Sequence, residues 1–245
     1  MSIGWLEADW PAPPGVRALS TFRVGGVSAG PYAALNLGDH VGDDPAAVAE
    51  NRRLLRHEAG LPSEPQWLAQ VHGVHVADLD ADAPRTAADA AVTRRFGAVC
   101  AILTADCLPV LLAADSGEVV AAAHAGWRGL AAGVIEATFQ AMGVDSDRTL
   151  AWLGPAIGPG SFEVGGEVRE AFVTQDTASR EAFAANTRGR YMADLGALAR
   201  RRLGILGITR IYGGTGECTH AAADRYFSHR RDGPCGRQAT LIWRS

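Results

Sequence analysis

Lysine is absent from this sequence. All 23 basic residues among the 245 are arginine, so no side chain carries a lysine amine. Enzymes that form a Schiff base through a lysine are therefore excluded, and so are nucleotide-binding proteins whose phosphate loop carries one. Any anion that the protein binds must be met by arginine, by histidine or by backbone N–H groups.

Cysteines are few and long hydrophobic runs are missing. Four cysteines without a short repeated spacing do not form the framework of a disulfide-rich domain. No apolar run approaches the roughly 20 residues of a membrane span. The first residues also lack the basic and apolar segments of a signal peptide. We therefore expect a cytoplasmic protein with reduced thiols and no membrane partner.

The chain also lacks a strong charge of either sign. Its net charge is −4, which offers no general electrostatic surface for nucleic acids, so we expect no nucleic-acid partner. A length of 245 residues with 47% hydrophobic residues is enough to bury a sizeable core. The sequence is compatible with a monomer and with a homodimer.

Strand and helix patterns interleave along the chain without a repeated unit or a linker. This arrangement predicts a single α/β domain spanning residues 1–245. Asp44 and Pro45 are typical of a helix start, and Gly60 is typical of its end. Further helices are predicted at 130–142, 166–173, 195–206 and 219–229, and strands at 19–24, 66–79, 96–103, 150–153, 208–212 and 238–243.

The segment between Cys107 and His124 predicts a β-hairpin. Two apolar runs flank a polar turn in which Asp115, Ser116 and Gly117 are typical turn residues. A turn centred between Asp115 and Ser116 places Cys107 directly opposite His124, with Cβ atoms roughly 5 Å apart. At that separation a thiolate and an imidazole can bind one metal ion at about 2.0–2.3 Å each. A three-residue loop would move the register by one position and weaken this expectation.

A catalytic zinc site usually takes three protein ligands, so Cys107 and His124 need a third. His72, which is followed by Gly73, is the best candidate, and His75 competes with it. If 66–79 is a strand, these two histidines point to opposite faces and only one of them joins the site. The spacing alone does not choose. Taken singly, each histidine would favour a hydrogen-bonded structural role, and the paired register of Cys107 and His124 is what favours a metal site.

The other cysteines and the acid beside Cys107 allow several interpretations. Cys100 lies in an apolar run and is expected to be a buried, inert thiol, while Cys218 and Cys235 have no matching histidine. Asp106 precedes Cys107, so it could orient a ligand or accept a proton during catalysis. A turn residue that closes the strand would explain Asp106 equally well.

The densest polar cluster lies at 224–233. On a helix over 219–229, Arg225 and His229 share a face. Arg23, close to two glycines, offers a similar group from the N-terminal half. Because arginine binds phosphate and carboxylate oxygens in a bidentate manner, we expect Arg23, Arg225 and His229 to bind an anionic substrate. A solvated, salt-bridged helix end is the alternative for this cluster.

Seven motifs follow one another along nearly the whole chain. They are TFRVGGVS (21–28), LNLG (35–38) with NR (51–52), QVHG (70–73), TADCLPV (104–110), HAGWRG (124–129), GPAIGP (154–159) and RYFSHRR (225–231). Together they resemble the bacterial laccase-domain family, also described as polyphenol oxidases and later as purine nucleoside phosphorylases or peptidoglycan editing factors.

The resemblance implies an α/β (α+β) fold, a mixed-sheet sandwich with helices on its outer faces. It implies a metal site of His72, Cys107 and His124, which selects His72 over His75, and it implies Zn²⁺, with Cu²⁺ also possible. The implied activity is phosphorolysis of adenosine, inosine, guanosine and methylthioadenosine, together with adenosine deamination. A nucleoside and phosphate would then be the small-molecule partners.

Other functions remain open at this point. The His-x-Glu and Cys-x-x-Cys motifs of zinc deaminases are absent, so the acid/base residue is unassigned, with Asp106 and His229 as candidates. A multicopper oxidase needs many histidines, whereas the seven here are scattered. Cys107 and His124 could instead be the nucleophile and base of a cysteine hydrolase, an amidase that would fit peptidoglycan-precursor editing. A non-enzymatic binding role would predict neither a metal nor converging polar groups.

Overall fold

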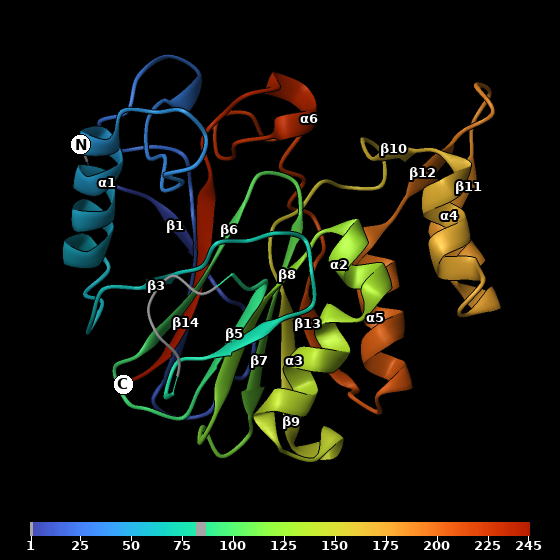
Figure 1. Ribbon diagram of the computed structural model, residues 1–245, viewed down its shortest axis with the longest axis horizontal. Helices are drawn as coiled ribbons and strands as arrows, with labels where there is room; N and C mark the ends of the chain where they lie inside the picture. The colour runs from blue at the N-terminus through green and yellow to red at the C-terminus, as the bar shows by residue number, and fades with distance from the viewer. Residues whose placement is uncertain (1, 82–86) are drawn as a thin grey trace.

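Two β-sheets packed face to face form the centre of the molecule, and helices cover their outer faces (Figure 1). The structure is a computed structural model that describes residues 2–81 and 87–245. In sheet order, the five-stranded sheet contains β1 (Trp5–Glu7), β2 (Val16–Thr21), β14 (Gln238–Arg244), β6 (Val99–Thr104) and β3 (Gln66–Trp67). The six-stranded sheet contains β13 (Arg210–Gly213), β9 (Thr149–Leu153), β7 (Leu108–Ala114), β8 (Val120–Ala125), β5 (Ala90–Thr93) and β4 (Val76–Asp78).

The helices lie on both outer faces, and a small third sheet stands beside them (Figure 1). The helices are α1 (Pro45–Glu58), α2 (Trp127–Ala132), α3 (Val134–Met142), α4 (Gly166–Val173), α5 (Leu195–Ile205) and α6 (His229–Asp232). The small sheet, which the sequence did not predict, contains β10 (Glu163–Val164), β12 (Tyr191–Ala193) and β11 (Phe183–Ala185).

Alternation along β7 explains why two sheets stack. Val110 and Leu112 point to the helical side, where they join a core with residues of α3 and α5. Leu111 points the other way, into the core between the two sheets, where it meets Ile102 and Ile242 of the five-stranded sheet. Because successive strand side chains alternate between faces, β7 is apolar throughout. The mixed-sheet sandwich with outer helices is confirmed.

Helix α1 covers the outer face of the five-stranded sheet. Leu55 packs there with Leu241 and Trp243 of β14. Asp44 begins the helix, since its carboxylate accepts a hydrogen bond from Ala46 N at 2.9 Å. The predicted start and end of this helix are therefore confirmed.

Loss of the Asp44 cap gives a first stability prediction. In Asp44→Ala the Ala46 N–H loses its partner, and the free energy of unfolding should fall by about 1 kcal/mol. The midpoint of urea denaturation should decrease with an unchanged slope. Asp145→Ala is the matched control, because Asp145 precedes a short 3₁₀ turn without making a side-chain cap. Equal losses in the two variants would contradict the capping role.

Several predicted elements match the structure and others differ. The helices at 166–173 and 195–206 and the strand at 238–243 are confirmed within one residue at their ends. The predicted helix 130–142 is divided by Gly133, whose φ of +101° ends α2 before α3 begins. The predicted strand 66–79 is wrong, since only β3 and β4 pair within it and a loop connects them.

The predicted helix 219–229 is also wrong, because α6 begins only at His229. The guanidinium of Arg231 donates to the carbonyl oxygens of Thr219, His220 and Tyr226 at 2.8–2.9 Å. A helix would use such carbonyls for its own backbone N–H groups, so this side chain stabilises a series of turns instead. Arg225 and His229 therefore do not share a helix face.

No helix formed by residues 2–81 and 87–245 combines the length and apolarity needed to cross a membrane.

Candidate metal centre

His72, Cys107 and His124 meet at one edge of the six-stranded sheet. Cys107 immediately precedes β7, His124 is the penultimate residue of β8, and His72 lies in the loop between β3 and β4. One ligand atom from each residue lies within 4.8 Å of the other two. In the described part of the chain, this is the one group of three histidine, cysteine or acidic residues that could hold a metal ion.

The predicted opposition of Cys107 and His124 is wrong, although the two residues do converge. Pro109 lies opposite His124. The four-residue loop between Ala114 and Val119 moves the register by two positions, and Gly117 N donates to Ala114 O within it. Because a shift by an even number keeps every side chain on its face, the two ligands still share one face of the hairpin.

Gly126 makes the room for an ion. A Cβ at this position would lie 2.9 Å from Cys107 Sγ and 3.1 Å from His72 Cδ2. Cys107 Sγ and His72 Nε2 are 3.9 Å apart, and the rings of His72 and His124 are separated by 4.8 Å between centroids. One thiolate and two imidazoles at these separations fit a single zinc or copper ion.

The loop that carries His72 explains why His75 is not part of the centre. His72 adopts a left-handed backbone with φ +62°, whereas the strand that would have set the two histidines on opposite faces does not exist. His75 is exposed and lines a shallow depression beside α3. Among the described non-glycine residues, only His72 and Asp106 (φ +91°) have positive φ. Both strained positions therefore lie at the candidate centre.

Asp89, which the sequence analysis missed, links two of the three ligands. Its fully buried carboxylate accepts from His124 Nδ1 at 2.8 Å. It also accepts from the backbone N–H groups of Val71, His72 and Gly73 at 3.1, 2.9 and 2.6 Å. One signal was visible in the sequence, since Asp89 is an acid within an otherwise apolar strand pattern.

The electrostatics of the centre favour a thiolate. Burial by itself raises the pKa of Cys107, but the charge of His124 and hydrogen bonds from both histidines outweigh it and lower the pKa to about 6. Burial likewise lowers the pKa of His124, but the Cys107 thiolate and Asp89 raise it to about 9. The surroundings therefore favour the thiolate form of Cys107, which is the form that binds metals.

Asp106 points to the C-terminal segment. Its carboxylate accepts from the Thr219 hydroxyl and from Arg230 N, both at 2.7 Å. Asp106 therefore connects the start of β7, next to Cys107, to the turns before α6 and to α6 itself. His229 lies next to Arg230 and is exposed, and its Nδ1 is 2.8 Å from Gly233 O.

The structure brings Arg23 and Arg225 side by side, since Arg23 N donates to Arg225 O at 2.7 Å. The Arg23 guanidinium donates twice to Ala33 O and stacks on Phe227 at 4.5 Å. Arg225 pairs with Glu217 at 3.0 Å and keeps 41% of its side chain exposed. Both predicted anion-binding arginines thus have protein partners, and Arg225 is the more accessible of the two.

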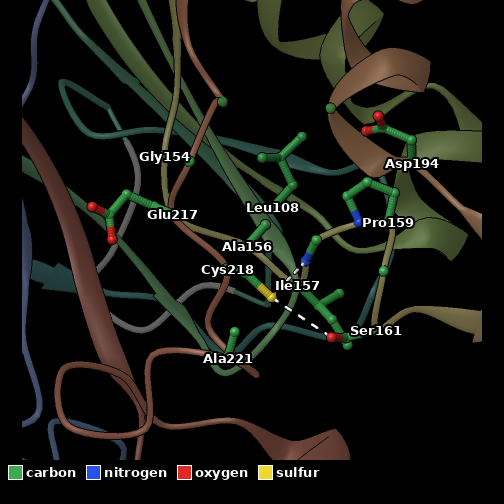
Figure 2. A pocket seen from close by; sticks show the side chains of 15 residues that line it. Leu108, Gly154, Ala156, Ile157, Pro159, Ser161, Asp194, Glu217, Cys218 and Ala221 are labelled. Atoms are coloured by element: carbon green, nitrogen blue, oxygen red, sulfur yellow. Dashed lines mark hydrogen bonds between the residues drawn. The ribbon is translucent and has the colours of Figure 1, made fainter.

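Cys218 does not belong to the group of His72, Cys107 and His124, and it lines a cavity of about 360 Å³ between the loops 154–161 and 214–221. Its sulfur accepts from Gly158 N at 3.2 Å and lies 3.9 Å from Ser161 Oγ (Figure 2). No histidine is among the residues that line this cavity. Cys100 and Cys235 are buried, as the sequence led us to expect for Cys100.

Comparison with known proteins shows the family to which this fold belongs. Residues 17–245 match the family described as multi-copper polyphenol oxidoreductase laccase. The chain belongs to this family. The resemblance seen in the seven sequence motifs is thereby confirmed.

Two relatives of this laccase-like chain cover almost its whole length. It is 55% identical over 241 residues to a purine nucleoside phosphorylase of Pseudomonas aeruginosa, with 98% of each protein covered. It is 51% identical over 239 residues to the purine nucleoside phosphorylase YfiH of Escherichia coli, covering 97% of this chain and 98% of the relative. Relatives with these names support an enzymatic role.

Solved structures share the fold of this family member. A Neisseria meningitidis protein, NMB0706, superposes with a TM-score of 0.93 at 47% identity, covering 98% of this chain and 99% of that one. YlmD from Geobacillus stearothermophilus gives a TM-score of 0.88 at 31% identity, with 98% and 96% covered. The multi-copper description of the family contrasts with the one three-ligand group found in residues 2–81 and 87–245.

Proposed function

We propose that this protein is a zinc-dependent purine nucleoside phosphorylase that acts on adenosine, inosine, guanosine and methylthioadenosine. The observation that carries the proposal is the convergence of His72, Cys107 and His124 in a chain whose relatives bear that name. Three protein ligands leave a further position open to a substrate, as in catalytic zinc sites. Copper is the alternative ion, since this donor set also suits it.

Phosphorolysis replaces the bond between the purine and C1′ of the ribose by a bond to phosphate. His72, Cys107 and His124 would hold the zinc ion, which would supply positive charge to stabilise negative charge developing on the substrate. His229 is our candidate for protonating the departing purine. Because Gly233 O can only accept, the His229 ring keeps a proton on Nδ1, so it can protonate the purine from Nε2 only as the doubly protonated imidazolium, and it returns to the neutral ring when that proton leaves.

Phosphate needs cationic groups, and a chain without lysine must supply them from arginine. We propose that Arg225 and Arg23 serve here, with Arg225 exchanging its partner Glu217 for phosphate. The hydrogen bond of Arg230 N to Asp106 supports this placement, because it holds the segment after Arg225 next to Cys107. Asp106 then acts by positioning Cys107.

Adenosine deamination at the same centre is the second activity that we propose. We further propose that residues 1–245 act as one cytoplasmic domain, as a monomer or a homodimer. Both activities use a small neutral nucleoside, and the four proposed substrates differ only in the purine edge and the 5′ group.

A cysteine hydrolase is the second candidate function. Cys107 would be the nucleophile, His124 its base, and Asp89 the carboxylate that orients His124, because His124 interacts with both of the other residues. An amidase of this kind would fit editing of a peptidoglycan precursor. A thiolate bound to zinc is poorly available for attack, so the metal content of the purified protein separates the two functions.

The proposed function is tested by incubating metal-quantified protein with adenosine and phosphate and resolving the products by chromatography. We expect adenine and ribose 1-phosphate, with inosine as the sign of deamination. In His72→Ala the rate should fall roughly 100-fold or more, since the charge of a metal is worth several kcal/mol and each ~1.4 kcal/mol is tenfold. His75→Ala is the matched control and should keep the full rate.

Failure of this test has a clear form. Fully zinc-loaded protein that yields none of these products would overturn the phosphorylase proposal and direct the assay to cell-wall precursors. Equal rates in the His72→Ala variant and the wild type would instead trace the activity to a contaminating enzyme.

A further inference from the structure

Asp89 is the group at the centre with the largest number of charge-assisted contacts. Its Oδ1 accepts from His124 Nδ1 at 2.8 Å and from His72 N at 2.9 Å. Its Oδ2 accepts from Gly73 N at 2.6 Å and from Val71 N at 3.1 Å. The carboxylate is fully buried, so all four hydrogen bonds are made without competition from solvent.

Each contact fixes a different property of a ligand. The bond to His124 Nδ1 requires a proton on that nitrogen, which leaves Nε2 as the nitrogen that can bind a metal. The bonds to the 71–73 backbone hold the turn in which His72 takes its strained φ of +62°. His72 and His124 come from different segments of the chain, and one side chain connects both.

We infer that Asp89 is the positioning residue of the metal centre, because its single carboxylate fixes the ring of one histidine ligand and the backbone of the other. It prepares both ligands before an ion binds. The inference concerns metal affinity and not the reaction, so it stands or falls separately from the proposed phosphorylase activity.

Asparagine is the informative substitution, because it has the shape of aspartate but only one acceptor oxygen. If its NH₂ group faces the 71–73 loop, two backbone N–H groups lose their acceptor and the His72 turn is released. If the NH₂ group faces His124 instead, it donates to Nδ1, and the ring proton moves to Nε2, where it blocks metal binding. Either orientation removes one ligand.

The test measures the dissociation constants of Zn²⁺ and Co²⁺ by competition with a chromophoric chelator. In Asp89→Asn both should rise about 10- to 100-fold, the usual effect of losing a partner that orients a metal ligand. The d–d bands of bound Co²⁺, which report the number and geometry of ligands, should also change. A purely structural role would lower the unfolding temperature without altering these bands.

Asp80→Asn is the matched control. Asp80 likewise accepts from a side chain and a backbone group, Thr93 Oγ1 at 2.6 Å and Arg94 N at 2.9 Å, but it lies beyond the far end of β4. The Zn²⁺ and Co²⁺ affinities of the Asp80→Asn variant should equal those of the wild type. Equal affinities and identical Co²⁺ spectra in Asp89→Asn and Asp80→Asn would overturn the inference.

A measurement on the wild type keeps the inference testable if Asp89→Asn does not fold. In zinc-loaded protein with ¹⁵N-labelled histidine, the His124 ring should carry a slowly exchanging proton on Nδ1 and none on Nε2. A proton on Nε2 would show that Asp89 does not set the ligand nitrogen.

Discussion

Replacing Cys107 with alanine should abolish metal retention and the proposed phosphorolysis together, while the protein stays folded. Cys107 supplies the one sulfur of the centre, and its lowered pKa makes it a thiolate near neutral pH. Cys107 precedes β7 and forms no strand pair with β8 or β9, so losing its side chain removes a ligand without breaking strand pairing. Metal analysis of the purified variant, the adenosine assay and the thermal unfolding temperature check the three parts of this expectation.

Cys218→Ala is the control for Cys107→Ala, because it removes a partly exposed thiol that no histidine accompanies. This variant should keep its metal and its activity. Stoichiometric zinc in Cys107→Ala would show that the ligand assignment is wrong. Wild-type protein that contains no metal, with a Cys107→Ala variant that is inactive, would favour the cysteine hydrolase.

The second large effect is expected from Gly126→Ala. Its backbone angles, φ −60° and ψ 154°, suit any residue, so the substitution acts through space and not through strain. The new Cβ would lie 2.9 Å from Cys107 Sγ and must push the sulfur or His72 aside. Overpacking of this kind costs about 1–3 kcal/mol, which corresponds to a ~5- to 150-fold weaker metal affinity.

Gly166→Ala controls for the general effect of adding a methyl group. Gly166 begins α4 without a positive φ, and a Cβ there would meet no atom within 4 Å. Chelator competition should give the wild-type zinc affinity for this variant. Unchanged affinity in Gly126→Ala would mean that the ion does not occupy the space between Cys107 and His72.

The candidate metal centre shows which sequence patterns predict a site well. The hairpin was predicted from its apolar runs, but its turn was placed one residue too early, so Pro109 and not Cys107 faces His124. The convergence survived because this error changes the strand register by two residues, and a shift by two keeps every side chain on the same face. The choice of His72 over His75 came only from the family resemblance, since the left-handed turn that presents His72 depends on the distant Asp89 carboxylate.

Elements built on local signals were predicted well, and elements built on distant side chains were not. Asp44 caps the start of α1 with its own carboxylate, and Gly60 follows the end of the helix. The turns at 219–228 instead depend on Arg231, whose guanidinium takes carbonyls that lie up to twelve residues earlier in the chain. A run of alanines favours a helix there, and no local pattern reveals the competing arginine.

The position of β14 determines when the sandwich can form during synthesis. β14 lies between β2 and β6, pairing Thr240 with Ser20 on one side and with Ile102 on the other. A nascent chain that has not yet released residues 238–244 from the ribosome therefore leaves one edge of β2 and one edge of β6 unpaired, and it lacks the Trp243 side chain that fills the core under α1. Exposed strand edges of this kind favour aggregation, so we expect chaperones to bind such a chain. The sandwich is completed only after β14 has been translated.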